Sequence, residues 1–202
     1  MVGLSRCPMA IAEVAEAITV GFDLEDGPVF LSTRWYTDPR DVLVRCSSLV
    51  SESEGKHYWF NPMFQPLLIV KTGTIKLSHF SVKEYLLSSH VEKDFSIEEK
   101  TSHLKISKIS VAYLLQFESF APLTKAIVDT SLLAQYAAQH CIDHTESGGM
   151  DPTLLKLILE LFTSETAVFT NWIRIWDIDC PWSRQDLQRR GVKFHLLFIM
   201  HH

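Results

Sequence analysis

The sequence lacks the residue patterns of the common enzyme and nucleotide-binding sites. It has no GxxxxGK[ST] loop to hold phosphate, no GxSxG around a serine nucleophile, no HExxH zinc pair and no GxGxxG turn. Ser47, Ser48 and Ser78 lie outside any nucleophile-elbow pattern, so a hydrolase that uses them with one of the histidines is a remote alternative. We therefore predict that the chain is not an enzyme.

The sequence also lacks an excess of basic residues and a long apolar run. Its net charge is -5 and its pI about 6.0, whereas proteins that coat nucleic acid carry a basic face. A membrane span needs about 20 consecutive apolar residues, and no run reaches that length. Arg6, Glu13 and Glu16 interrupt the first twenty residues, which argues against a signal peptide. These observations predict a cytoplasmic protein that binds no membrane.

Cysteine is scarce and scattered. Cys7, Cys46, Cys141 and Cys180 form no CxxC pair and have mostly apolar neighbours. Widely spaced cysteines in apolar surroundings are typical of reduced thiols in an intracellular protein. We predict four free thiols and no disulfide.

A histidine pair is the nearest approach to a metal-binding pattern. His140 and His144 are four residues apart on a predicted helix, with Cys141 and Asp143 beside them. A structural zinc site needs four ligands, and no second pair at short spacing follows elsewhere. We predict no metal and interpret the pair as surface or partly buried histidines.

What the sequence does contain is the periodicity of helices. Apolar side chains recur on one face over residues 11–20. Asp38 followed by Pro39 predicts the start of a second helix, because Asp caps well and proline is tolerated in the first turn. Its predicted buried stripe comprises Val42, Leu43, Cys46, Leu49 and Val50, and the polar run 51–56 ends it.

A small β element precedes a capped helix. Residues 67–70 and 74–77 are rich in β-formers and flank Lys71-Thr72-Gly73, which predicts a hairpin. Ser81 and Glu84 have capping-box spacing before a helix over residues 82–89, with Phe80 and Tyr85 at staple positions.

The remainder is predicted to be helical. Ser96 and Glu99 repeat the capping-box spacing before a segment that runs to residue 117, and a further helix covers 131–144. Gly148-Gly149 ends that block, and Asp151-Pro152 starts the next helix. The predicted buried face of that helix comprises Leu154, Leu155, Ile158, Leu161 and Phe162.

Aromatic and basic residues near the end of the chain have two interpretations. Trp172, Trp176 and Trp182 have helical spacing, which favours packing in a core over base stacking. The basic cluster after them is interpreted as a solvated domain end and comprises Arg184, Arg189, Arg190 and Lys193. In the helix that starts at Asp38, acidic Asp38 and Asp41 balance Arg40 and Arg45, so DNA binding is not favoured.

Several stretches in order resemble one family. The segment LSHFSVKEYL, residues 77–86, is similar to the end of the winged-helix domain of fungal NACHT–ankyrin proteins. This winged-helix type is also named after GPI inositol-deacylase. Two stretches upstream are similar to other parts of that domain: AIAEVAEAITV and DPRDVLVRCSSLV. Four stretches downstream resemble the helical linker that leads to the ankyrin repeats: VAYLLQF, LLAQYAAQHCIDH, NWIRIWDID and PWSRQDLQRR.

The resemblance implies a fold and a role. The fold is mainly α: a truncated winged helix over 5–90 with a β-hairpin wing, a helical array over 95–185, and an unassigned tail over 186–202. In this family of signal-transduction ATPases the winged helix packs over bound ADP, and a histidine at the end of the wing contacts a phosphate. His79 occupies that position here. A structural role, in which His79 only joins hairpin and helix, is equally open.

The chain departs from the family at both ends. The first winged-helix segment, the nucleotide-binding domain and the ankyrin repeats have no counterpart in these residues. We therefore expect a non-catalytic regulatory module that relays nucleotide state, that binds protein partners or adjacent domains, and that has no cofactor of its own, since an absent domain would bind ADP or ATP. The alternatives are a DNA-binding winged helix and a stand-alone adaptor. The missing helix leads us to expect that the isolated chain is marginally stable and prone to associate.

Overall fold

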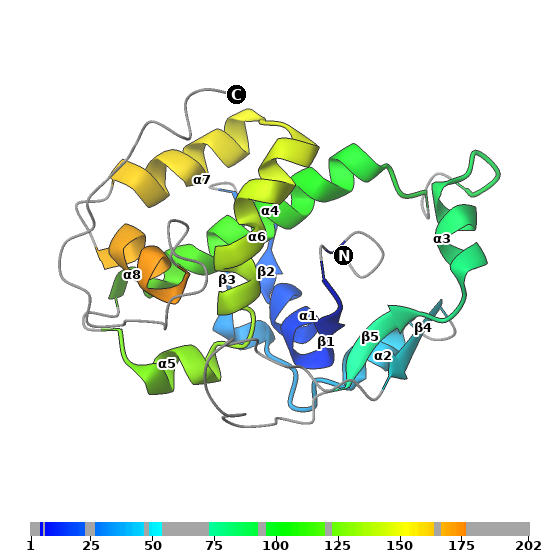
Figure 1. Cartoon of the computed structure of the whole chain (residues 1–202), viewed down its shortest axis with the longest axis horizontal. Coiled ribbons are helices and arrows are strands. Elements are labelled where there is room, and N and C mark those ends of the chain that lie inside the picture. The colour runs from blue at the N-terminus through cyan, green and yellow to red at the C-terminus, as the bar shows by residue number, and fades with distance from the viewer. Residues whose placement is uncertain are drawn as a thin grey trace, which may run out of the picture.

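The fold is described from a computed structural model (Figure 1). It describes residues 5, 7–22, 27–46, 49–53, 73–92, 96–119, 123–163 and 167–176. Of these residues, 64% are helical and 10% lie in strands, which confirms the prediction of a mainly α protein.

The N-terminal part combines short helices with two small sheets. Antiparallel strands pair in the order β1–β5–β4, and β2 pairs with β3 in a separate two-stranded hairpin. Its elements are β1 (Met9–Ala10), α1 (Ile11–Ala17), β2 (Val20–Gly21), β3 (Val29–Phe30), the 3-10 helix η1 (Ser32–Arg34), α2 (Asp41–Cys46), β4 (Val50–Ser53), β5 (Thr74–Leu77) and α3 (Phe80–Leu87).

The C-terminal part is a helical array. The longest helix, α4, packs along α6 and α7, and α8 packs against η3 and α6. The elements are α4 (Glu99–Leu115), the 3-10 helix η3 (Gln116–Ser119), α5 (Lys125–Thr130), α6 (Ala134–Gly148), α7 (Pro152–Thr163) and α8 (Ala167–Ile175).

Two helix ends in this part follow from local sequence. Asp151 caps α7, because its Oδ1 accepts the backbone N–H of Leu154 at 2.8 Å, as predicted from the Asp-Pro pair. Gly149 ends α6 with φ +76°, a left-handed conformation that glycine adopts without a steric cost.

The second predicted helix is shorter than expected. It ends at Cys46, and residues 50–53, predicted as its last turn and the polar run that ends it, form strand β4 against β5. Val42 is buried as predicted, but Leu49 is exposed. The residue types at 50–53 are compatible with a helix end or with a strand. Backbone pairing with β5 selects the strand. The predicted partner strand 67–70 lies outside the described residues, and β5 pairs with β1 on one edge and with β4 on the other.

Three local predictions in helices were wrong. His79, not Ser81, caps α3, which begins at Phe80. The next helix begins at Glu99 with Glu98 as its N-cap, not at Ser96. On α7, Leu155 is exposed although it was predicted to be buried, and Leu157 is buried instead. The face of α7 that contacts α4 is therefore rotated from the face predicted from the spacing of apolar residues.

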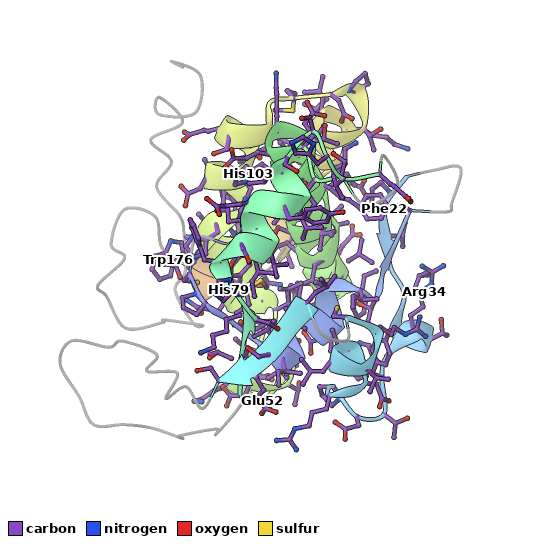
Figure 2. All side chains as sticks on the ribbon, turned by 90° about the vertical axis from the view of Figure 1, so that its right-hand side faces the viewer. Phe22, Arg34, Glu52, His79, His103 and Trp176 are labelled. Carbon is purple, nitrogen blue, oxygen red and sulfur yellow. The ribbon has the colours of Figure 1, made fainter. Side chains whose placement is uncertain are left out.

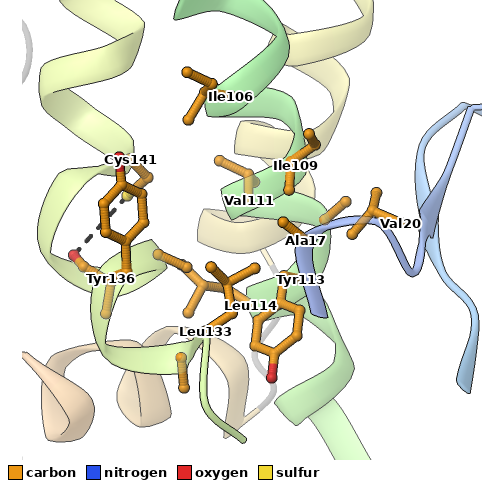
Figure 3. Close-up of a cluster of buried hydrophobic side chains, with 14 of the residues drawn as sticks. Ala17, Val20, Ile106, Ile109, Val111, Tyr113, Leu114, Leu133, Tyr136 and Cys141 are labelled. Carbon is orange, nitrogen blue, oxygen red and sulfur yellow. Dashed lines mark hydrogen bonds between the residues drawn. The ribbon is translucent and has the colours of Figure 1, made fainter. Parts of the chain in front are cut away.

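One buried cluster connects the two parts. Ala17 and Val20 lie beside Tyr113, Leu114 and Leu133, from helices far along the chain (Figure 3). The cluster therefore contains residues from both sides of the predicted boundary at 90–95, and the domain division stays a prediction.

The cysteine and tryptophan predictions can be followed where residues are described. Cys7, Cys46 and Cys141 are free thiols, and Cys180 lies outside the described residues. Trp172 is 2% exposed and Trp176 packs at the edge of the core. Trp182 and the basic cluster that follows it lie outside the described residues. Among the helices that are described, none has the length and apolar character that a membrane span requires.

Candidate functional site

His79 stands at the junction between strand β5 and helix α3 (Figure 2). Its backbone is extended, with φ -148° and ψ 149°, and its side chain turns back over the first turn of the helix. Nδ1 accepts the backbone N–H of Ser81 at 3.2 Å and lies 2.7 Å from the Ser81 hydroxyl oxygen. His79 is therefore the N-cap of α3, in the place where Asp, Asn or Ser is usual.

This cap fixes the chemistry of the imidazole ring. A neutral histidine that accepts at Nδ1 carries its proton on Nε2. Nε2–H is therefore a hydrogen-bond donor, and the His79 side chain is exposed. His79 is the N-cap of α3, so its ring lies at the end of the helix whose dipole favours an anion. The arrangement suits contact with a phosphate or carboxylate oxygen.

Helix α3 exposes apolar surface next to His79. None of its eight residues is buried. The side chains of Phe80 and Tyr85 are 71% and 55% exposed, so the predicted staple does not enclose them. Within the described part of the chain, α3 contacts β5, and Leu86 accepts the backbone N–H of Ile97 at 2.9 Å. Among the described residues, the apolar side chains of α3 therefore have little cover.

A buried carboxylate joins the two parts of the molecule. Glu16 of α1 accepts a hydrogen bond from the hydroxyl of Tyr113 in α4. The same oxygen accepts the backbone N–H of Leu133, at the start of α6, at 2.8 Å. This N–H would otherwise lack a partner, and the N-terminus of a helix favours negative charge. No local sequence pattern predicts this contact, because the partners of Glu16 lie 97 and 117 residues away.

Glu13, one turn earlier in α1, lies in surroundings that disfavour its charged form. Its Oε2 accepts the backbone N–H of Ala10 at 2.6 Å, and the residue is 5% exposed. Burial raises the pKa of the Glu13 carboxyl from 4.5 to about 7, the Ala10 N–H opposes that rise, and the nearby Glu16 adds to it. Glu13 therefore titrates near neutral pH.

The predicted histidine pair is buried, with His140 8% and His144 0% exposed, and does not lie on the surface or only partly buried as predicted. The two rings have different hydrogen-bond partners. His144 is fully buried; its Nδ1 lies 2.7 Å from Nδ1 of His103, and its Nε2 lies 2.8 Å from the hydroxyl of Tyr136. His140 instead lies 3.2 Å from Asp143 and 3.7 Å from the sulfur of Cys7. The sequence analysis did not identify His103. Its position on the buried face of α4 becomes clear only in the structure.

The described residues contain no group of three or more His, Cys, Asp or Glu side chains placed to hold a metal ion. Cys7 and His140 do not form an activated pair either. Burial, with a contribution from Glu13, raises the pKa of the Cys7 thiol. Burial also raises the pKa of the Cys141 thiol to about 12. Both sulfurs are protonated at neutral pH and are poor nucleophiles.

The arginines of the α2 region are engaged within the fold. Arg40 pairs with Glu52 of β4 at 3.4 Å, and Arg45 lies over the ring of Tyr36 at 5.7 Å. With six residues, α2 is also short for a helix that reads the major groove.

The comparisons with known proteins give one distant relative. The chain is 27% identical over 185 residues to the azaphilone pigments biosynthesis cluster protein L of the fungus Monascus ruber. The match covers 87% of this chain but 36% of that protein, so the chain spans about a third of the relative's length. No protein-family profile matches the chain, and no solved structure matches it significantly. The chain is thus similar, at a distance, to part of a fungal protein.

Proposed function

We propose that this chain is a non-catalytic regulatory and interaction module of a NACHT-type signal-transduction ATPase of fungal type, in which His79 senses the bound nucleotide. The observation that carries the proposal is the exposed Nε2–H of His79 at the N-terminus of α3. The order of the family-like stretches and the similarity to part of a longer fungal protein support it. The nucleotide itself would be bound by a domain outside this chain.

The geometry supports contact with a diphosphate in one specific way. The capped imidazole presents one donor to the outside and keeps the other nitrogen for the helix. A phosphate oxygen that accepts this N–H also lies in the favourable field of the helix N-terminus. Loss of the nucleotide would remove the anion and leave the His79 cap intact. The site therefore responds to ligand without unfolding.

A continuous set of contacts leads from His79 to the helical array. His79 follows β5, and β5 pairs with β1 through Ile75 and Met9. Strand β1 runs directly into α1, whose Glu16 binds the start of α6. A displacement of β5 would therefore reach α6 through one strand pair and one helix. This supports a relay between the N-terminal part and the helical array, and double-mutant cycles on these residues measure its strength.

The decisive experiment separates the sensing role of His79 from its capping role. Asn is a good N-cap residue, so His79→Asn keeps an acceptor for the helix, but its amide N–H groups lie closer to the backbone and leave no donor at the position of Nε2. His79→Ala removes both functions. In a longer protein that carries this segment after a nucleotide-binding domain, both variants are expected to weaken ADP binding about tenfold or more, the loss of a hydrogen bond to a charged group.

His90→Ala serves as the control, since it removes another exposed histidine beyond the end of α3. It is expected to leave ADP affinity unchanged. If His79→Asn binds ADP like the wild type while His79→Ala only loses stability, His79 is a helix cap and the sensor role is refuted. On the 202-residue chain, histidine side-chain NMR tests the Nε2–H tautomer directly.

Partners and location follow from the same proposal. We propose that adjacent domains or protein partners cover α3, whose apolar side chains lie open beside His79. The same exposure favours a second candidate, a stand-alone adaptor that binds a protein through α3. We place both in the cytosol, where the free thiols of Cys7, Cys46 and Cys141 would persist.

A further inference from the structure

A buried histidine pair joins α4 to α6, the two helices that pack along one another at the centre of the array (Figure 1). His103 of α4 is 8% exposed, and His144 of α6 is fully buried. Their Nδ1 atoms lie 2.7 Å apart, a hydrogen-bond distance at which one nitrogen donates and the other accepts. The two rings therefore share one proton between these nitrogens.

The neighbours of the pair give its hydrogen bonds a direction. Oε1 of Glu99 lies 4.0 Å from Nε2 of His103, which favours a proton on that nitrogen. Nδ1 of His103 is then the acceptor, and Nδ1–H of His144 is the donor. Nε2 of His144 accepts the hydroxyl of Tyr136, at 2.8 Å. In this arrangement both rings are neutral.

Helices α4 and α6 approach each other closely beside the pair. A Cβ added to Gly148 of α6 would overlap the backbone of Leu104, the residue that follows His103. Ser107, one turn further along α4, lies 2.6 Å from Thr145 of α6, hydroxyl oxygen to hydroxyl oxygen. The two histidine rings therefore cannot move apart unless this end of α6 moves away from α4.

This geometry limits how many protons the pair can hold. A charged histidine donates from both ring nitrogens. One added proton fits, because the two Nδ1 atoms still share a single hydrogen and Glu99 faces the positive charge. A second added proton puts a hydrogen on each Nδ1 and two positive rings in contact at a buried site, which is strongly unfavourable. Lys100, whose Nζ lies beside Gly149 at the end of α6, adds to the positive charge of this region.

Other charged groups near the pair come from α4, α6 and α7. Nζ of Lys108 lies 2.5 Å from Oδ2 of Asp151, at the start of α7. Nδ1 of His140, one turn before His144 on α6, lies 3.2 Å from Asp143. Lys108 and Asp151 offset each other's charge, and Asp143 faces His140.

We propose that His103 and His144 form an acid-sensitive latch, which keeps α6 docked on α4 at neutral pH and releases it in acid. This inference is independent of His79 and of the proposed function. In the unfolded chain each histidine takes up a proton near pH 6.5, so the two take up about two protons in acid. The folded pair takes up at most one, so its contribution to stability is present at neutral pH and is lost as pH falls through about 6.5.

The size of the effect follows from the difference in bound protons. Between pH 7 and pH 5, the pair lowers the equilibrium constant for folding at least about sixfold, the value for a folded pair that takes up one full proton. The decrease reaches roughly 600-fold if the folded pair takes up none.

The test is urea unfolding of the 202-residue chain at pH 7 and pH 5, with the wild type compared with the double variant His103→Gln/His144→Gln. Glutamine amides form hydrogen bonds with each other but do not titrate in this range. From pH 7 to pH 5, the folding constant of the wild type is expected to fall at least about sixfold further than that of the double variant. Comparing the two proteins cancels the titration of Glu13, whose contribution has the opposite sign.

His90→Gln is the control, because it removes an exposed histidine beyond the end of α3. It is expected to show the same dependence on pH as the wild type. Equal dependence on pH in the wild type and in a folded double variant overturns the proposal.

A second measurement does not require the double variant to fold. NMR titration of the histidine ring signals of the wild type counts the protons that the folded pair takes up between pH 7 and pH 5. At most one is expected, with the second taken up only as the backbone amide signals of the folded chain are lost. Uptake of two protons by His103 and His144 in a chain that stays fully folded refutes the latch.

Discussion

The buried carboxyl group of Glu13 predicts a distinctive dependence of stability on pH. Burial raises its pKa from 4.5 to about 7, so the folded state holds the proton more tightly than the unfolded chain. The resulting contribution to the free energy of unfolding is complete below pH 4.5 and is lost as pH rises through about 7. The difference between the two pKa values corresponds to about 3 kcal/mol at most.

The substitution Glu13→Gln removes this titration and keeps a side-chain oxygen for the Ala10 N–H. Relative to the wild type, the variant is expected to gain stability as pH rises from 5 to 8, by up to about 3 kcal/mol. Urea unfolding followed by circular dichroism, at low protein concentration and several pH values, measures this difference. Using the difference between the two proteins cancels the titration of all other groups.

The matched control is Glu146→Gln, at an exposed position of α6. It is expected to change stability by no more than about 0.5 kcal/mol, with little dependence on pH. If the stability difference between Glu13→Gln and the wild type is constant from pH 5 to 8, the carboxyl group is not buried in its neutral form. The packing of α1 against the array would then be incorrect.

Three further predictions concern the contacts that hold the array together. Tyr113→Phe removes one hydrogen-bond donor from the buried Glu16 side chain and should lower the free energy of unfolding by about 1–3 kcal/mol in a urea titration. Tyr85→Phe, on exposed α3, is the control and should have almost no effect on that free energy. Asp151→Ala removes the α7 cap and the ion pair with Lys108, so it should lower the free energy of unfolding by about 1–2 kcal/mol, measured by thermal melting. High salt should not restore the lost stability. Trp172→Ala opens a cavity among α6 and α8 and should cost about 3–5 kcal/mol; a loss below 1 kcal/mol would show that this ring is not part of the core.

The capping and turn residues show how much local sequence determined. Asp151 followed by Pro152 predicts the start of α7 because a side-chain acceptor and a missing N–H both suit that position, whatever lies around it. Gly149 likewise predicts the end of α6, since the left-handed turn there needs no tertiary contact. The apolar periodicity around these positions places the helices of the array for the same reason.

Tertiary contacts decided what local sequence left open. Residues 50–53 form a strand because β5 supplies the hydrogen bonds, and a helical pattern cannot reveal a partner more than twenty residues away. The mainly α class, the cap at Asp151 and the position of His79 between strand and helix were determined by the sequence alone. The rotation of α7 that buries Leu157 and exposes Leu155, and the contacts of Glu16 with Tyr113 and Leu133, were decided only by the fold, because burial depends on which distant surfaces meet.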